Sequence, residues 1–174
     1  GYGQNMSVVV KAVAELLDLD NFLVHIVGDG SKLAEMQDEV KANGVEDKFV
    51  FYGRKPKEQM PEYYRLADVL LITLRGDNEV ANTLPGKMQE YMSVGKPIVG
   101  SANGTVKEII ERTDIGICDP ANDFCGLAQA MKEMIEFPDK YKMCGKRAVD
   151  YFEENFSLPV HIQKLVGQLD SLVI

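Results

Sequence analysis

The chain has 174 residues, 45% of them hydrophobic and 26% charged, which is the composition of a globular domain with a sizeable core. Its net charge of −8 gives no support for nonspecific binding to nucleic acid or to an anionic membrane. No apolar run reaches the ~18 to 20 residues of a membrane span, and no signal peptide is visible. The three cysteines, Cys118, Cys125 and Cys144, lack metal-ligand spacing, so we expect free thiols and a cytoplasmic location.

Short apolar segments alternate with amphipathic helical patterns along the chain, and this alternation is typical of parallel α/β proteins. We therefore predict a doubly wound parallel sheet with helices on both faces and extra C-terminal helices. The apolar run 22–27, broken only by His25, predicts a strand that is buried on both faces. Expected strands are 22–27, 49–52, 69–74, 98–100 and 115–118, and expected helices are 9–17, 33–44, 60–66, 85–94, 105–112, 123–136, 138–153 and 158–172.

The loops that follow parallel strands are expected together at the C-terminal edge of the sheet. Each of them contains at least one glycine, which allows the backbone to approach a ligand closely. Together these loops predict a binding site for a nucleotide-like ligand at that edge of the sheet. These loops are residues 1–4, 28–31, 53–56, 75–85 and 101–104.

The stretch 74–99 reads as strand, polar loop, short helix and strand. Pro85 suits the first turn of the helix, and Gly95 suits a left-handed stop. Lys87 and Glu90 are three residues apart, so they share one face near the helix N-terminus. A cation, a carboxylate and free backbone N–H groups at this position favour a binding site for a phosphorylated ligand. An ordinary solvated ion pair explains the spacing of Lys87 and Glu90 equally well.

Six short motifs stand in a characteristic order along the chain. They are Val-Gly-Asp-Gly (27–30), Phe-Val-Phe-Tyr-Gly (49–53), Tyr-Arg-Leu-Ala-Asp-Val (64–69), Glu-Tyr-Met-Ser-Val-Gly-Lys-Pro-Ile-Val (90–99), Gly104 with Glu-Ile-Ile (108–110), and Gly-Ile (116–117). In this order they resemble the C-terminal, donor-binding domain of GT-B-fold glycosyltransferases. The resemblance is to the large retaining family 4 (group 1), of the type that makes capsule, O-antigen and exopolysaccharide, and it runs from residue 8 to about 155.

The resemblance implies specific roles around the central helix. Glu90 matches the family's second glutamate, which accepts hydrogen bonds from the ribose hydroxyls. Asn82 stands where the family has its first glutamate, so a neutral amide replaces the usual sugar contact. Lys87 is the candidate for the diphosphate and, with Asn82, for catalysis. Backbone at Thr83, Leu84, Pro85 and Gly86 is expected beside the nucleotide.

The resemblance also assigns nucleotide contacts to three other loops. Gly3 belongs to the first loop, beside the diphosphate. Gly28, Asp29 and Gly30 form the second loop. Backbone at Arg54 and Lys55 is expected to contact the base.

The activity implied is metal-free, cofactor-independent transfer of a sugar, with retention, from a nucleotide diphosphate. UDP is the expected nucleotide, and a glycan or lipid-linked molecule the expected acceptor. We expect residues 1–174 to be one domain of a two-domain enzyme whose first strand and N-terminal acceptor domain are absent, so that the fragment alone is inactive. The full-length enzyme is expected to associate peripherally with the membrane, and no nucleic-acid partner is expected.

Two other functions stay open. A nucleotide-sugar 2-epimerase has the same fold, and a module that has lost catalysis would explain Asn82. In the family the last helix crosses back towards the N-terminal domain, so its apolar positions are expected to be partly exposed here and to favour self-association. These positions are Val160, Leu165, Leu169 and Leu172.

Overall fold

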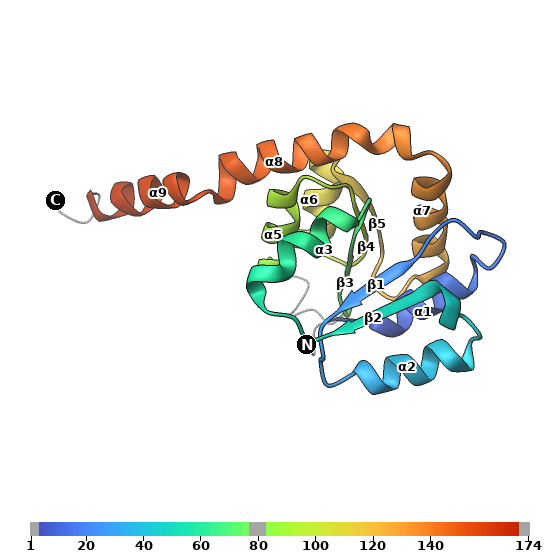
Figure 1. The fold of residues 1–174 in the computed structure, drawn as a ribbon. Coiled ribbons are helices and arrows are strands. Elements are labelled where there is room, and N and C mark those ends of the chain that lie inside the picture. The colour runs from blue at the N-terminus through green and yellow to red at the C-terminus, as the bar shows by residue number, and fades with distance from the viewer. Residues whose placement is uncertain (1–3, 77–82, 171–174) are drawn as a thin grey trace.

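The computed structural model describes residues 4–76 and 83–170 (Figure 1). The strands are β1 (Val24–Val27), β2 (Phe49–Gly53), β3 (Leu70–Thr73), β4 (Ile98–Ser101) and β5 (Gly116–Asp119). The helices are α1 (Met6–Ala14), α2 (Leu33–Ala42), α3 (Met60–Leu66), α5 (Gly86–Val94), α6 (Thr105–Thr113), α7 (Phe124–Glu136), α8 (Lys142–Phe156) and α9 (Leu158–Asp170), with short 3-10 turns η1 (Glu46–Lys48), η2 (Lys57–Gln59) and η3 (Pro138–Tyr141).

The paired strands all run parallel, which confirms the α/β class, but they form two sheets rather than one. β1 pairs with β2, whereas β3, β4 and β5 form a second sheet in that order. Among the described residues no strand pairs with the second edge of β1 or of β3. The single sheet expected from the sequence is therefore interrupted between these two strands.

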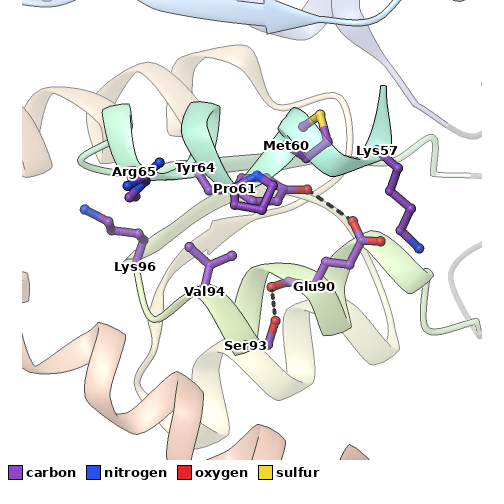
Figure 2. A pocket seen from close by; sticks show the side chains of 9 residues that line it. All are labelled: Lys57, Met60, Pro61, Tyr64, Arg65, Glu90, Ser93, Val94 and Lys96. Atoms are coloured by element: carbon purple, nitrogen blue, oxygen red, sulfur yellow. Dashed lines mark hydrogen bonds between the residues drawn. The ribbon is translucent and has the colours of Figure 1, made fainter. Parts of the chain in front are cut away.

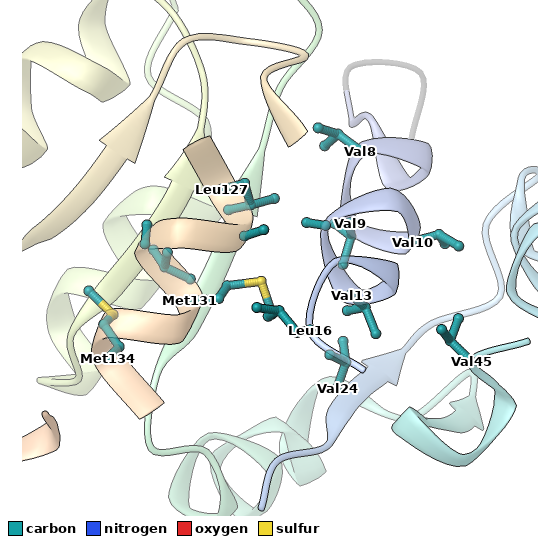
Figure 3. Close-up of a cluster of buried hydrophobic side chains, with 14 of the residues drawn as sticks. Val8, Val9, Val10, Val13, Leu16, Val24, Val45, Leu127, Met131 and Met134 are labelled. Carbon is teal, nitrogen blue, oxygen red and sulfur yellow. The ribbon is translucent and has the colours of Figure 1, made fainter. Parts of the chain in front are cut away.

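Side chains of the three-stranded sheet alternate between two hydrophobic clusters, as the two-residue period of a strand requires. Leu71, Val99 and Ile117 face the first cluster, which also contains side chains of β2. Side chains of α1, α7 and β1 in the same cluster are drawn in Figure 3. Ile72 and Ile98 face the second cluster, which is built with α5, α6 and α8. Helices thus cover both faces of this sheet, and both sheets contribute to the first cluster.

The prediction that residues 22–27 form a strand buried on both faces is wrong. The strand begins at Val24, and His25 is exposed. The ring of His25 stacks on Tyr52 of β2, and its Nδ1 lies 2.8 Å from the Tyr52 hydroxyl. A two-stranded sheet packs one face on the core and leaves the other open, so an apolar run alone did not decide burial.

Helix α5 is fixed at both ends by backbone geometry. Pro85 is the N-cap residue, in extended conformation, and therefore lies just before the first turn rather than within it. Gly95 ends the helix with φ +74, the left-handed conformation that favours glycine. Gly145 of α8 packs closely against this end of α5. A Cβ atom on Gly145 would lie 2.1 Å from the Gly95 carbonyl oxygen. Helix α8 therefore sets the position of α5.

The expected helix 138–153 is divided into η3 and α8, and α9 then projects away from the rest of the domain (Figure 1). On α9, Leu158, Ile162, Leu165 and Val166 are 72%, 51%, 57% and 48% exposed.

None of the helices in residues 4–76 and 83–170 is long and apolar enough to span a membrane. Cys118, Cys125 and Cys144 are free thiols, as expected.

Candidate functional site

The loops after β1 and β2 are joined by their backbones. The Gly28 N–H donates to the Gly53 carbonyl oxygen over 2.8 Å. Both residues have positive φ, +137 for Gly28 and +64 for Gly53, which is strained for other residue types. This bond connects the predicted nucleotide loop 28–30 to the segment that begins at Arg54, the predicted contact to the base.

A second group of loops gathers at the ends of the three-stranded sheet. Asn103, after β4, accepts a hydrogen bond from the Ala121 N–H over 3.0 Å. Asn5, just before α1, donates to Asn122 Oδ1 over 2.6 Å. Gly76, after β3, lies so close to the Asn103, Ala121 and Asn122 side chains that a Cβ on it would be in van der Waals contact with them. The first loop is thus beside the loops after β3, β4 and β5, as the parallel topology predicts.

The N-cap residue of α5 leaves the first N–H groups of the helix without a partner from its own side chain. Pro85, the N-cap, has no side-chain oxygen to accept from them and forms no side-chain cap. The Met88 N–H bonds back to the Pro85 carbonyl oxygen at 2.9 Å. The preceding N–H groups, of Gly86 and Lys87, belong to the helix end that normally binds a cap, water or an anion.

Lys87 occupies this positive end of the helix, where a cation is disfavoured by the helix dipole. Within the described part of the chain it forms no ion pair, and its side chain is solvent-exposed. Desolvation by the surrounding protein nevertheless lowers the pKa of the Lys87 amine, while the Glu90 carboxylate acts in the opposite direction. An anion bound at this helix end would attract the Lys87 ammonium and so offset both the unfavourable helix dipole and the desolvation of the amine.

Glu90 lies one turn further along α5, at the mouth of a groove between α3 and α5 (Figure 2). Its Oε2 accepts a hydrogen bond from the Tyr64 hydroxyl over 3.1 Å. Burial, and then the charge of Glu90, raises the pKa of Tyr64 to about 12. The Tyr64 ring meets the ring of buried Tyr91 edge to face, with centroids 6.0 Å apart.

The groove has a volume of about 510 Å³ and is charged at both ends. Lys57 and Glu90 lie at one end, and Arg65 and Lys96 lie together at the other (Figure 2). The carboxylate at the first end offers several acceptor sites to neighbouring hydroxyl groups of a ligand. Apolar side chains line the wall between them, namely Met60, Pro61 and Val94.

The structure describes most of the predicted site residues, but not all of them. Gly28, Asp29 and Gly30 share one loop, with Asp29 exposed, and Arg54 and Lys55 follow the backbone bond from that loop. Thr83 and Leu84 lead into α5. Gly3 and Asn82 lie outside the described residues, so their predicted roles stay predictions.

Tyr64 is the residue that the sequence analysis did not assign to the site. It belongs to the Tyr-Arg-Leu-Ala-Asp-Val motif at 64–69, where a buried ring is the simplest interpretation. Its spacing from Glu90 is 26 residues, so no local pattern links the two side chains.

These features define a doubly wound α/β domain with loops and an open helix N-terminus at the C-terminal ends of its strands. The chain belongs to the family Glycosyl transferases group 1, which matches residues 2–150.

Named relatives show where the similarity lies. The chain is 30% identical over 130 residues to a 2-deoxystreptamine glucosyltransferase of Streptomyces kanamyceticus, covering 74% of this chain and 32% of that protein. It is 30% identical over 104 residues to the amylovoran biosynthesis glycosyltransferase AmsK of Erwinia amylovora, covering 59% of this chain and 26% of that protein. A crystal structure of Anabaena Alr3699/HepE in complex with UDP has a TM-score of 0.83 at 19% identity, covering 98% of this chain and 46% of that one. The chain therefore spans less than half the length of these proteins, and with HepE it shares the fold.

Proposed function

We propose that the chain is the nucleotide-sugar donor-binding domain of a retaining, metal-independent glycosyltransferase. The observation that carries the proposal is the α5 N-terminus, where Lys87, open N–H groups and Glu90 lie within about one helical turn. Membership of Glycosyl transferases group 1 supports it. UDP is the proposed nucleotide, in keeping with the UDP in the HepE crystal structure.

In this proposal the helix end stabilises the leaving group. When the bond between sugar and diphosphate breaks, negative charge grows on the diphosphate. The Lys87 ammonium and the first α5 N–H groups belong to the same helix end, and donors that are fixed in place before the reaction stabilise such charge without reorganisation. Glu90 accepts hydrogen bonds from the ribose hydroxyls and orients the nucleotide for the reaction.

The proposed acceptor is a glycan or a lipid-linked molecule of surface polysaccharide synthesis, bound by a separate N-terminal domain. The polysaccharide role of the relative AmsK supports this acceptor class. The interrupted sheet supports a further strand between β1 and β3, because both strands have an edge that no described strand pairs with. We place the full-length enzyme in the cytoplasm at the membrane surface, and we expect the 174 residues alone to bind nucleotide but to transfer no sugar.

Isothermal titration of UDP and GDP into the 174-residue chain tests the donor site. One nucleotide is expected to bind the wild-type chain, and Glu90→Ala is expected to lose that binding. Glu153→Ala is the matched control, because Glu153 is an exposed glutamate on α8, away from the groove. Absence of binding to the folded wild-type chain, or equal binding to Glu90→Ala, would contradict the proposed site. A module that only assembles with partners would bind neither nucleotide.

A further inference from the structure

We propose that Tyr64 is the positioning residue for Glu90, whose carboxylate it holds in the orientation that receives the ribose hydroxyls of the donor nucleotide. This inference rests on the proposed function, because it needs Glu90 to contact ribose. It adds a residue of α3 to a site otherwise built from loops and α5.

The need for a positioning residue follows from the place of Glu90. Its side chain is exposed on the surface of α5, and a free glutamate side chain there samples several rotamers. Fixing it on ligand binding costs conformational entropy. Within the described residues, the hydrogen bond to its carboxylate comes from the Tyr64 hydroxyl at 3.1 Å (Figure 2). The bond therefore reduces the rotamer freedom of Glu90 before a ligand arrives.

Tyr64 is itself well held. Its ring contacts the ring of Tyr91 edge to face, and Tyr91 is only 9% exposed. A tyrosine side chain has two rotatable angles, so a packed ring directs its hydroxyl with little freedom. The pKa of Tyr64 is raised to about 12, so the hydroxyl keeps its proton and stays a donor at neutral pH.

The geometry leaves room for a ligand. Tyr64 donates to Oε2 of Glu90. An ionised carboxylate has about four acceptor positions, so one hydrogen bond leaves Oε1 and a second position on Oε2. Two adjacent ribose hydroxyls can use these without displacing Tyr64. The bond is therefore compatible with the ligand-bound state and does not block it.

The neighbouring Tyr63 provides a matched control. It is on the same helix but its ring meets the edge of Tyr52, with centroids 5.0 Å apart. Tyr63→Phe and Tyr64→Phe each remove one hydroxyl and keep the ring. Of these two substitutions, only Tyr64→Phe removes the hydrogen bond to Glu90.

The test is isothermal titration of UDP and of 2′,3′-dideoxy-UDP, which lacks the ribose hydroxyls that Glu90 receives. The variants are Tyr64→Phe, Glu90→Ala and Tyr63→Phe, with thermal unfolding to show that each is folded. Tyr64→Phe is expected to weaken UDP binding about two- to tenfold, the range for one side chain that must be ordered on binding. The effect should vanish with the dideoxy ligand, and Tyr63→Phe should bind as wild type.

The outcomes separate this inference from the proposed function. If Tyr64→Phe leaves UDP affinity unchanged, or weakens the binding of UDP and of the dideoxy ligand equally, Tyr64 has a packing role only and the inference is wrong. In that case a loss in Glu90→Ala still supports the donor site. If Glu90→Ala binds UDP and GDP as the wild type does, or neither nucleotide binds the wild type, both the inference and the proposed function fail.

Discussion

Lys87 and Glu90 lie on one helical turn, but the structure treats them differently. Glu90 has a hydrogen bond from Tyr64. Lys87 has no ion pair in the described part of the chain, it is partly desolvated, and it stands at the helix end that disfavours cations. On this basis we propose that Glu90 receives a neutral, hydrogen-bonding part of the ligand and that Lys87 binds an anionic part.

From this contrast we predict that Lys87 contributes to the binding of the phosphates and not to the binding of the nucleoside. Lys87→Met should weaken UDP binding roughly ten- to a hundredfold, the range for loss of a hydrogen bond to a charged group, and should leave uridine binding unchanged. Isothermal titration of the two ligands measures this, with Lys41→Met on α2 as control. Equal losses for UDP and uridine would show that Lys87 does not act on the phosphates.

Tyr64 predicts a pH effect on stability. Because its folded-state pKa is raised from 10.0 to about 12, the folded state holds this proton more tightly than the unfolded state. The contribution of Tyr64 to stability is fully present below about pH 10 and is lost as the pH rises towards 12. Urea unfolding between pH 8 and 11 should therefore show a smaller decline for Tyr64→Phe than for the wild-type chain.

The comparison of variants is needed because other groups act in the same direction. Burial also raises the pKa of Tyr91, and it raises the pKa of Cys118 to about 11. Cys118 is present in both proteins, so its effect cancels in the difference. The charge of Tyr64 contributes to the raised pKa of Tyr91, so Tyr64→Phe also reduces the Tyr91 contribution, in the same direction as the expected change. Parallel declines for the two proteins would contradict the raised pKa of Tyr64.

At the scale of elements, the position of α5 depends on its contact with α8. Gly95 must be in left-handed conformation to end α5, and Gly145 must lack a side chain for α8 to approach. Helix α5 is therefore fixed at its C-terminal end by backbone contact with α8. Its N-terminus lies at the opposite end of the helix, away from this contact. The Gly-Lys-Pro sequence after α5 predicts the stop, whereas no local pattern predicts the role of Gly145.

Gly145→Ala is expected to destabilise the fold by about 1 to 3 kcal/mol, because its Cβ meets backbone rather than a movable side chain. Urea unfolding measures the change. Gly167→Ala on α9 is the matched control: nothing lies within 4 Å of a Cβ there, and alanine is favoured over glycine in a helix by roughly 0.5 to 1 kcal/mol. Equal stability of Gly145→Ala and the wild-type chain would mean that α5 and α8 can separate without cost.

At the scale of the whole molecule, two parallel sheets share a hydrophobic cluster, and α9 extends beyond them. The expected partial exposure of the last helix is confirmed at Leu165 and at Val160, which is half-buried. Leu172 lies outside the described residues, and the Leu169 side chain is not described. The helix thus carries apolar surface that contributes little to the core.

The exposed side of α9 predicts concentration-dependent self-association. Light scattering during size-exclusion chromatography should show a mass that rises with loading, and the pair Ile162→Glu with Leu165→Glu should abolish the rise. The melting temperature at low concentration should change little, because both side chains are already about half exposed. A monomer at every loading would contradict the prediction.

The interrupted sheet predicts an uneven pattern of hydrogen exchange in β3. The Leu70 and Leu74 N–H groups bond to β4, so the alternation of a strand points those of Leu71 and Thr73 to the opposite edge. We expect the amides of Leu71 and Thr73 to exchange faster than those of Leu70 and Ile72 in the 174-residue chain. Equal protection at all four positions would mean that this edge is already paired or covered.

The element order, the α/β class and the helix that carries Lys87 and Glu90 could be predicted from local signals in the sequence. These signals are apolar periodicity, glycine and proline at element ends, and short motifs in a characteristic order. The division into two sheets, the exposure of His25, the Gly145 contact and the bond from Tyr64 to Glu90 became known only from the folded chain. Each of these joins residues far apart in the chain, and packing rather than local propensity determines which distant side chains meet.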